Sequence, residues 1–214
     1  MSALVPQPFA VLLARALAEF ERERAIFDFP RRSFWKGADG VDLGLALHGQ
    51  RAANPIGPAA GPHTQLAQNL VIAWLAGARV LELKTVQVLD RLEIPRPCID
   101  AATIGFNVEW SQELGIEESL EQYVAGWYLI HVLGKRGIVG EGRHDTVFDA
   151  SIGYDLAGIR SPKVARFLDS LSDVSTHLAR LRDGLPPALR EAADVEVVHG
   201  MFLDQTRALG RGVW

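Results

Sequence analysis

Residues 54–86 read NPIGPAAGPHTQLAQNLVIAWLAGARVLELKTV and contain the pattern that decides the fold. A short apolar run, Ile56–Ala60, is followed by helical spacing over Leu66–Ala76 and then by strand-forming residues over Arg79–Val86. Gly77 follows the last helical position directly, where glycine commonly ends a helix. The stretch therefore predicts a strand–helix–strand unit with parallel strands and a right-handed crossover.

The same alternation extends on both sides of this unit. Upstream, helical spacing covers residues 7–26, and residues 41–48 alternate like a short strand or hairpin arm. Downstream we expect a loop over 87–115, a helix capped by Ser119 and running to about Leu133, a strand over Val147–Ile152, a helix over Pro162–Leu181, a short helix over Pro186–Ala193 and a strand over Val195–Leu203. The order is helix, hairpin and then β-α-β-α-β-α-β. Two α/β architectures fit this order, an open doubly wound sheet or an arc of a (β/α)8 barrel.

Composition excludes several functional classes. The 214 residues carry 22 basic and 26 acidic side chains, which argues against a nucleic-acid-binding protein with a basic face. The single cysteine, Cys98, excludes a disulfide framework and a cysteine-rich metal site built by this chain alone. No apolar run is long enough to span a membrane, and the first 20 residues do not resemble a secretory signal. We expect a cytoplasmic globular protein.

The turn at residues 54–65 is the first candidate site. Ala59, Ala60 and Gly61 are small, so their backbone could approach a planar or phosphorylated ligand closely, and the helix that follows offers free N–H groups at its start. A tight strand-to-helix turn with proline and glycine explains the same pattern equally well. The segment matches neither the dinucleotide fingerprint nor the phosphate-binding P-loop.

The strand at 79–86 carries two charges that a buried parallel strand should not contain. Alternation places Val80, Glu82, Lys84 and Val86 on one face of this strand. Lys84 lies near the carboxyl end, where α/β proteins bind ligands. The lysine either stabilises negative charge on a cofactor or forms a structural pair with Glu82 inside the sheet.

Further candidates follow the later strands. The loop 87–115 is long enough to be a lid or binding loop, and Asn107 within it can both donate and accept hydrogen bonds. Ser151 and Asp149 share a face of the third strand, where they could contact a ligand or form a capping turn. His63 lies in the glycine turn, whereas His131 belongs to an apolar helix face. No pair of histidines has the spacing of a metal site, and we predict none.

Three strings carry a resemblance to a known family: GPAAGPHTQLAQN at 57–69, LELKTVQ at 81–87 and NVEWS at 107–111. They resemble the flavin-binding half of dihydroorotate dehydrogenase-like barrels, and more closely the N-terminal part of the family named putative selenate reductase subunits. The resemblance implies a flavin (FMN) oxidoreductase. In it Ala59, Ala60, Gly61, Lys84 and Thr85 would contact the flavin, and Asn107 and Ser151 the substrate. Asp149 stands where the family tends to have asparagine.

The resemblance also implies that this chain is incomplete. After a lead-in over residues 1–50, residues 51–203 would form about four βα units of a partial (β/α)8 TIM barrel, and residues 204–214 a divergent tail. The later strands, which supply the phosphate-binding loops, would then come from another subunit, from self-association or from missing sequence. Iron–sulfur clusters would lie in such modules. The alternatives are a non-catalytic half-barrel that acts as an interaction subunit, and an unrelated α/β enzyme with a Schiff-base lysine.

Overall fold

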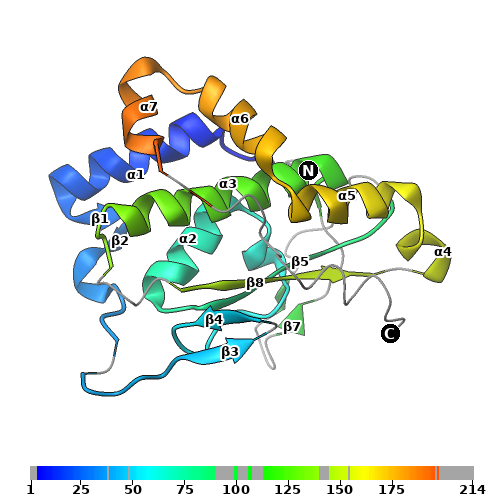
Figure 1. The fold of residues 1–214 in the computed structure, drawn as a ribbon, viewed down its shortest axis with the longest axis horizontal. Coiled ribbons are helices and arrows are strands. Elements are labelled where there is room, and N and C mark those ends of the chain that lie inside the picture. Colours follow the sequence, from blue (N-terminus) through cyan, green and yellow to red (C-terminus); the bar gives the residue numbers. More distant parts are fainter. Residues whose placement is uncertain are drawn as a thin grey trace.

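The computed structural model describes residues 4–37, 39–47, 49–89, 99–100, 106–107, 113–139, 145–153, 155–195 and 197, and only the backbone of 99–100 and 106–107. Figure 1 shows a small parallel sheet in the lower half of the molecule, with an antiparallel hairpin below it, two central helices above it and further helices on top. The helices are α1 (Phe9–Glu23), α2 (Ala67–Ala76), α3 (Ile116–Lys135), α4 (Leu156–Ile159), α5 (Pro162–Ser172), α6 (Ser175–Asp183) and α7 (Pro187–Ala193). The strands are β1 (Ala25–Ile26), β2 (Phe29–Pro30), β3 (Leu45–Leu47), β4 (Gln50–Ala52), β5 (Val80–Val86), β6 (Ile99–Asp100), β7 (Phe106–Asn107) and β8 (Val147–Ile152), with 3-10 turns at Arg31–Ser33 and Pro62–Thr64.

The parallel pair β5 and β8 confirms the predicted second and third strands of the βα series. Glu82 lies opposite Asp149, and Leu83 lies opposite Ala150. The register then shifts between Leu83 and Val86, so that Val86 lies opposite Ile152. This bulge corrects the predicted alternation, because Val86 now shares the face of Leu83 rather than that of Glu82.

The predicted first strand, Ile56–Ala60, is an extended segment without a regular ladder. The N–H groups of Arg79 and Val80 both donate to the carbonyl of Ile56, at 2.7 and 3.2 Å, and the N–H of Glu82 donates to the carbonyl of Pro58 at 3.3 Å. Residue 58 is a proline without an N–H, so it cannot return a ladder bond to β5. The segment 56–58 nevertheless lies along the edge of β5 opposite β8. Spatial order therefore follows chain order, as in an arc of a barrel.

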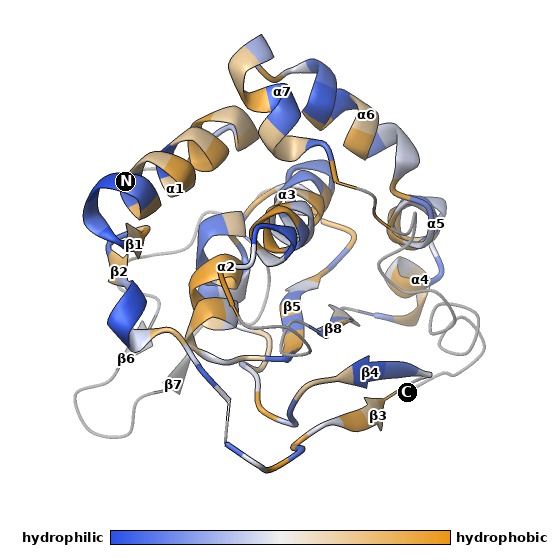
Figure 2. Cartoon of the chain, turned by 60° about the vertical axis from the view of Figure 1, so that its left-hand side comes forward, coloured by the Kyte–Doolittle hydropathy of each residue, from blue (hydrophilic) through white to orange (hydrophobic). Residues whose placement is uncertain are grey.

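The helices cover one face of this sheet. Leu81, Leu83 and Phe148 are buried in the same core as α2 and α3. Most of α3 is buried, and in Figure 2 this helix runs near the centre of the molecule with other helices around it. Gly126 makes the crossing of α2 and α3 close, because a Cβ there would lie 2.9 Å from Leu70 Cδ1.

Two helix predictions need correction. The helix expected from Ser119 begins three residues earlier, at Ile116, with Gly115 as its N-cap residue and Glu118 accepting the N–H of Gly115 at 2.9 Å. The helix expected over 162–181 is interrupted at Asp173 and Val174, where the Asp173 carboxylate accepts the N–H of Ser175 at 3.0 Å. An aspartate that bonds the backbone two residues on competes with the continuing helix.

The remaining predictions concern the lead-in helix, the helix ends and the hairpin. The end of α2 at Gly77 and the short helix near residue 187 are confirmed, with Gly77 in the left-handed conformation at φ 117°. The lead-in helix is confirmed over Phe9–Glu23, but its predicted end at residue 26 is wrong, because Arg24 turns the chain in the left-handed conformation and Ala25–Ile26 form β1. The hairpin arm is also confirmed, as the antiparallel pair β3–β4. Figure 2 shows β4 beside β8, and the N–H of Ala53 donates to the carbonyl of Asp145 at 2.9 Å. Most of the loop 87–115, nearly all of the strand expected at 195–203 and the tail 204–214 lie outside the described residues.

Candidate active site

The turn at Ala59–Gly61 lies at the carboxyl end of the segment 56–58 and is closed by its own hydrogen bonds. Gly61 donates its N–H to the Thr64 hydroxyl at 3.1 Å, and Thr64 returns its N–H to the Gly61 carbonyl at 2.9 Å. Thr64 is buried, whereas Ala59 is exposed and Ala60 is half-buried. Ala59 and Ala60 contribute only methyl groups, so at these two residues the side chains leave room for a ligand to approach the backbone.

Glu82 connects this turn to the next two strands. Its carboxylate Oε2 accepts the N–H of Ala60 at 2.9 Å, and its Oε1 accepts the hydroxyl proton of Ser151 on β8. Glu82 itself is on β5, so one side chain ties together three neighbouring backbone segments. The structure thus brings two predicted site residues, Ala60 and Ser151, to the same carboxylate.

Lys84 follows at the bulge of β5, two residues towards the carboxyl end. Its side chain is 1% exposed. The hydroxyl of Tyr123, from α3, donates to the Lys84 backbone carbonyl at 2.7 Å. Burial raises the pKa of Tyr123 above its ordinary value, so the hydroxyl keeps the proton that it donates. Thr85, beside Lys84 in the bulge, is half-buried. Tyr123 therefore fixes the backbone that carries the candidate lysine.

The other predicted site residues are placed less completely. Asp149 lies directly opposite Glu82 in the register of β5 and β8. For Asn107 only the backbone, in β7, is described, and Cys98 lies outside the described residues. His63 is exposed, and its ring covers Gly61, since a Cβ at Gly61 would lie 2.6 Å from His63 Cε1. His131 packs edge-to-face against Trp127 at 4.6 Å, which agrees with a structural role.

Arg79 marks the opposite end of β5. It is fully buried between the rings of Trp35 and Trp74, with its guanidinium carbon 4.7 and 5.2 Å from their centroids. It also donates to the carbonyls of Trp74 and Ala78, at 2.7 and 2.6 Å. Burial lowers the pKa of Arg79 to about 10. At the amino end of a barrel strand such a packed cation serves stability rather than chemistry.

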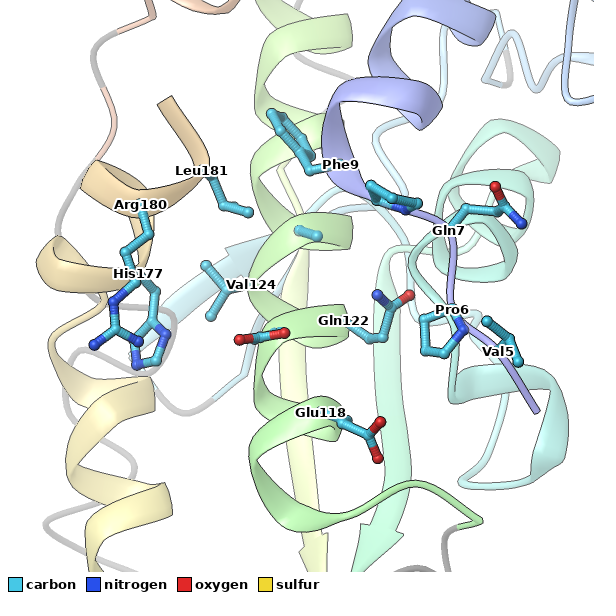
Figure 3. Close-up of a pocket in the computed structure, with 13 residues that line it drawn as sticks. Val5, Pro6, Gln7, Phe9, Glu118, Gln122, Val124, His177, Arg180 and Leu181 are labelled. Carbon is cyan, nitrogen blue, oxygen red and sulfur yellow. The ribbon is translucent and has the colours of Figure 1, made fainter. Parts of the chain in front are cut away.

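A separate cavity lies on the helical side of the molecule. Its volume is about 480 Å³. It is bounded by α3, by α6 and by the segment that precedes α1. Figure 3 shows Glu118 and Gln122 from α3 on one side of it, and His177 and Arg180 from α6 on the other. None of its lining residues belongs to the sheet, so this cavity is distinct from the site around Glu82.

The described residues contain neither a metal site nor a membrane-spanning helix. Within the ranges that the structure describes, no group of three or more histidine, cysteine, aspartate or glutamate side chains could hold a metal ion. In the same part of the chain, no helix is both long and apolar enough to cross a membrane.

Sequence reasoning missed two residues of this site. The sequence pattern suggests only Lys84 as a partner for Glu82, and it does not point to Tyr123. The charge of Glu82 in a buried strand was the available signal. For Tyr123, the signal was a hydroxyl on the inner side of an apolar helix, because such a hydroxyl needs a partner.

Comparison with known proteins identifies the family of this chain. Residues 27–196 match the family model described as "Oxidoreductase YgfK, N-terminal TIM-barrel domain". The chain is also 42% identical over 190 residues to "Putative oxidoreductase YgfK" of Escherichia coli strain K12 and to its counterpart in E. coli O157:H7. Each match covers 88% of this chain but 18% of the relative, so the chain spans less than a fifth of their length. It belongs to the family of the YgfK N-terminal TIM-barrel domain.

Proposed function

We propose that this chain supplies one half of an FMN site in an oxidoreductase. The observation that carries the proposal is the bonding of Glu82, which holds the Ala59–Gly61 turn and Ser151 together at the carboxyl end of the sheet. Ligands of α/β proteins bind at this end. The names of the matched family and of the E. coli relatives support an oxidoreductase.

The residues present fit a flat ring that gains negative charge when it is reduced. Ala59 and Ala60 carry only methyl groups and Ala59 is exposed, so a ring can approach the backbone at these two residues, whereas the His63 ring covers Gly61. Lys84 supplies a positive charge on the neighbouring strand, where an ammonium group would stabilise the negative charge of a reduced ring. When bound, FMN would supply the electron-accepting chemistry, and this chain would position the ring and tune its potential.

The other half of the site needs further residues. Val80, Glu82, Asp149 and Ser151 share the sheet face that the helices do not cover, and all four are half-buried. We propose that further barrel strands, from more sequence or from a partner chain, cover this face and supply the phosphate-binding loops. A cytoplasmic location stays a prediction from the sequence.

The test is a titration of the purified chain with FMN, followed by the visible absorbance of the flavin and by thermal unfolding. Saturating FMN at about 100 times its Kd should stabilise the fold by about 2.7 kcal/mol. Lys84→Ala should weaken binding or lower the potential, because the positive charge beside the ring is lost. Lys36→Ala, which removes an exposed lysine, is the matched control and should bind like the unmodified chain. A chain that neither retains FMN nor gains stability from it would refute the proposal.

A non-catalytic interaction subunit is the second candidate. Ile56 is 67% exposed and Leu43 is 40% exposed, and both line a cavity beside the segment 56–58. Apolar side chains gathered at an open sheet edge favour contact with another protein or another part of the polypeptide. Sedimentation of the purified chain tests this candidate, since a monomer at all concentrations that also melts cooperatively would argue against it.

A further inference from the structure

We propose that Glu82 is a positioning residue that locks the Ala59–Gly61 turn and makes Ser151 a hydrogen-bond acceptor, so that the site favours ligands that donate hydrogen bonds over oxyanions. This inference rests on the proposed function only in taking this end of the sheet as the ligand site. It goes beyond that function because it concerns the chemical class of the ligand.

The turn is held through Ala60. The Ala60 N–H donates to Glu82 Oε2 at 2.9 Å, and the backbone N–H of the same glutamate donates to the Pro58 carbonyl at 3.3 Å. Glu82 thus forms two hydrogen bonds with the segment 58–60, one through its backbone and one through its side chain. Loss of the side chain would leave the N–H of Ala60 without this acceptor and the turn with one fewer restraint.

The second contact determines the direction of the hydrogen bond at Ser151. A serine hydroxyl has one proton and two acceptor lone pairs, and a carboxylate can only accept. Because the Ser151 hydroxyl donates to Glu82 Oε1, Ser151 can offer only acceptor positions to anything else. The Ala60 N–H likewise donates to Glu82, so it is not available to donate to a ligand.

The residues beside Ser151 are also acceptors. Asp149 lies opposite Glu82 in the sheet register, so the two side chains share one face of the sheet. At Ser151 and Glu82 a carboxylate or another oxyanion would meet acceptor oxygens without a matching donor, which disfavours its binding there. A neutral amide, imide or ring N–H would instead find acceptors for its protons. We therefore assign neutral N–H donors as the ligand class at Ser151 and Glu82.

The restraint on the turn is tested by amide hydrogen exchange of the folded chain, measured on the fragment that covers residues 56–64. This measurement needs no bound flavin. Glu82→Ala should speed exchange at Ala60 by about tenfold, because the acceptor is lost. Glu82→Gln keeps an amide oxygen that can accept the same N–H and should stay within about threefold of the unmodified protein. If Glu82→Ala exchanges like the unmodified protein, or if Glu82→Gln exchanges as fast as Glu82→Ala, the positioning role is refuted.

The ligand class is tested with two small probes, succinimide as a cyclic N–H donor and acetate as an oxyanion. Binding is followed by the chemical shifts of the Ala60 and Ser151 amides. The unmodified chain should bind succinimide at least about tenfold more tightly than acetate. In Glu82→Gln the amide NH2 can donate to Ser151, which frees the hydroxyl proton for an acceptor ligand, so the preference should shrink.

Three outcomes would overturn the assigned ligand class: tighter binding of acetate, an unchanged preference in Glu82→Gln, or no response to either probe. Failure of the chain to bind FMN is a separate result. It would reject the proposed function and leave the exchange and probe experiments to decide the role of Glu82.

Discussion

Substitution of Gly57 by alanine should disrupt the first segment of the sheet. A Cβ built on Gly57 would lie 1.4 Å from the carbonyl oxygen of Val80 and 2.5 Å from its carbonyl carbon. Both are backbone atoms of β5, so no side chain can rotate to make room. Real Cβ atoms do not approach other heavy atoms closer than 3.0 Å, so the segment would have to move outward by well over an ångström.

The cost follows from the bonds that such a movement would break. Three backbone hydrogen bonds hold the segment to β5: two accepted by Ile56, at 2.7 and 3.2 Å, and one accepted by Pro58, at 3.3 Å. An outward shift of this size would stretch all three beyond the range of a hydrogen bond. At about 1 to 1.5 kcal/mol each, Gly57→Ala should lower the free energy of unfolding by about 3 to 5 kcal/mol.

Urea unfolding followed by tryptophan fluorescence measures this loss, since Trp35 and Trp74 pack around Arg79 at the adjacent end of β5. Gly115→Ala is the control, because its Cβ would meet only the flexible end of Glu118, at 3.4 Å. That variant should lose less than about 1 kcal/mol as an N-cap substitution. A Gly57→Ala protein within 1 kcal/mol of the unmodified chain would refute the placement of residues 56–58 along β5.

Three further substitutions test other parts of the structure. Tyr123→Phe should cost about 1 to 3 kcal/mol in urea unfolding and weaken FMN binding, because the buried Lys84 carbonyl loses its donor; unchanged values for both would contradict the contact. Gly126→Val should cost about 2 to 4 kcal/mol in the same assay, since a Cβ would lie 2.9 Å from Leu70 and 3.2 Å from the Ala67 backbone. Burial and Arg180 lower the pKa of His177 from 6.5, although Glu117 and Glu121 oppose the shift. The unfolded chain should therefore bind the proton first as the pH falls, so the free energy of unfolding should decline from about pH 6.5 downwards, and His177→Gln should reduce that decline.

Local patterns predicted the parts of the fold that local forces decide. The helix that ends at Gly77 and the strand Val80–Val86 follow from residues that are neighbours in the chain. The family resemblance added the barrel, which the matched family model supports. The bulge between Leu83 and Val86 was not predictable in this way, because it depends on how β5 pairs with β8, more than 60 residues later. Because of that bulge, strict alternation placed Val86 on the wrong face.

The role of Glu82 was hidden for the same reason. Its two side-chain partners, Ala60 and Ser151, are 22 and 69 residues away, and no local rule connects them. Along the strand, Lys84 is the obvious partner for this charge, two positions away, but the flanking strands supply the donors that bind it. Tyr123 and the Lys84 carbonyl, 39 residues apart, are a second case of such a long-range contact.

The charge of Glu82 is related to the proline at position 58 in the first segment. Pro58 has no N–H with which to return a bond to β5, so a regular ladder cannot form at that residue. The Glu82 carboxylate instead accepts the N–H of Ala60, two residues beyond this proline, while its backbone N–H bonds the Pro58 carbonyl. A side chain thus provides a bond that backbone pairing would otherwise supply. An apolar residue at position 82 would suit a buried parallel strand better, but it would leave the turn unattached at the point where a ligand is proposed to bind.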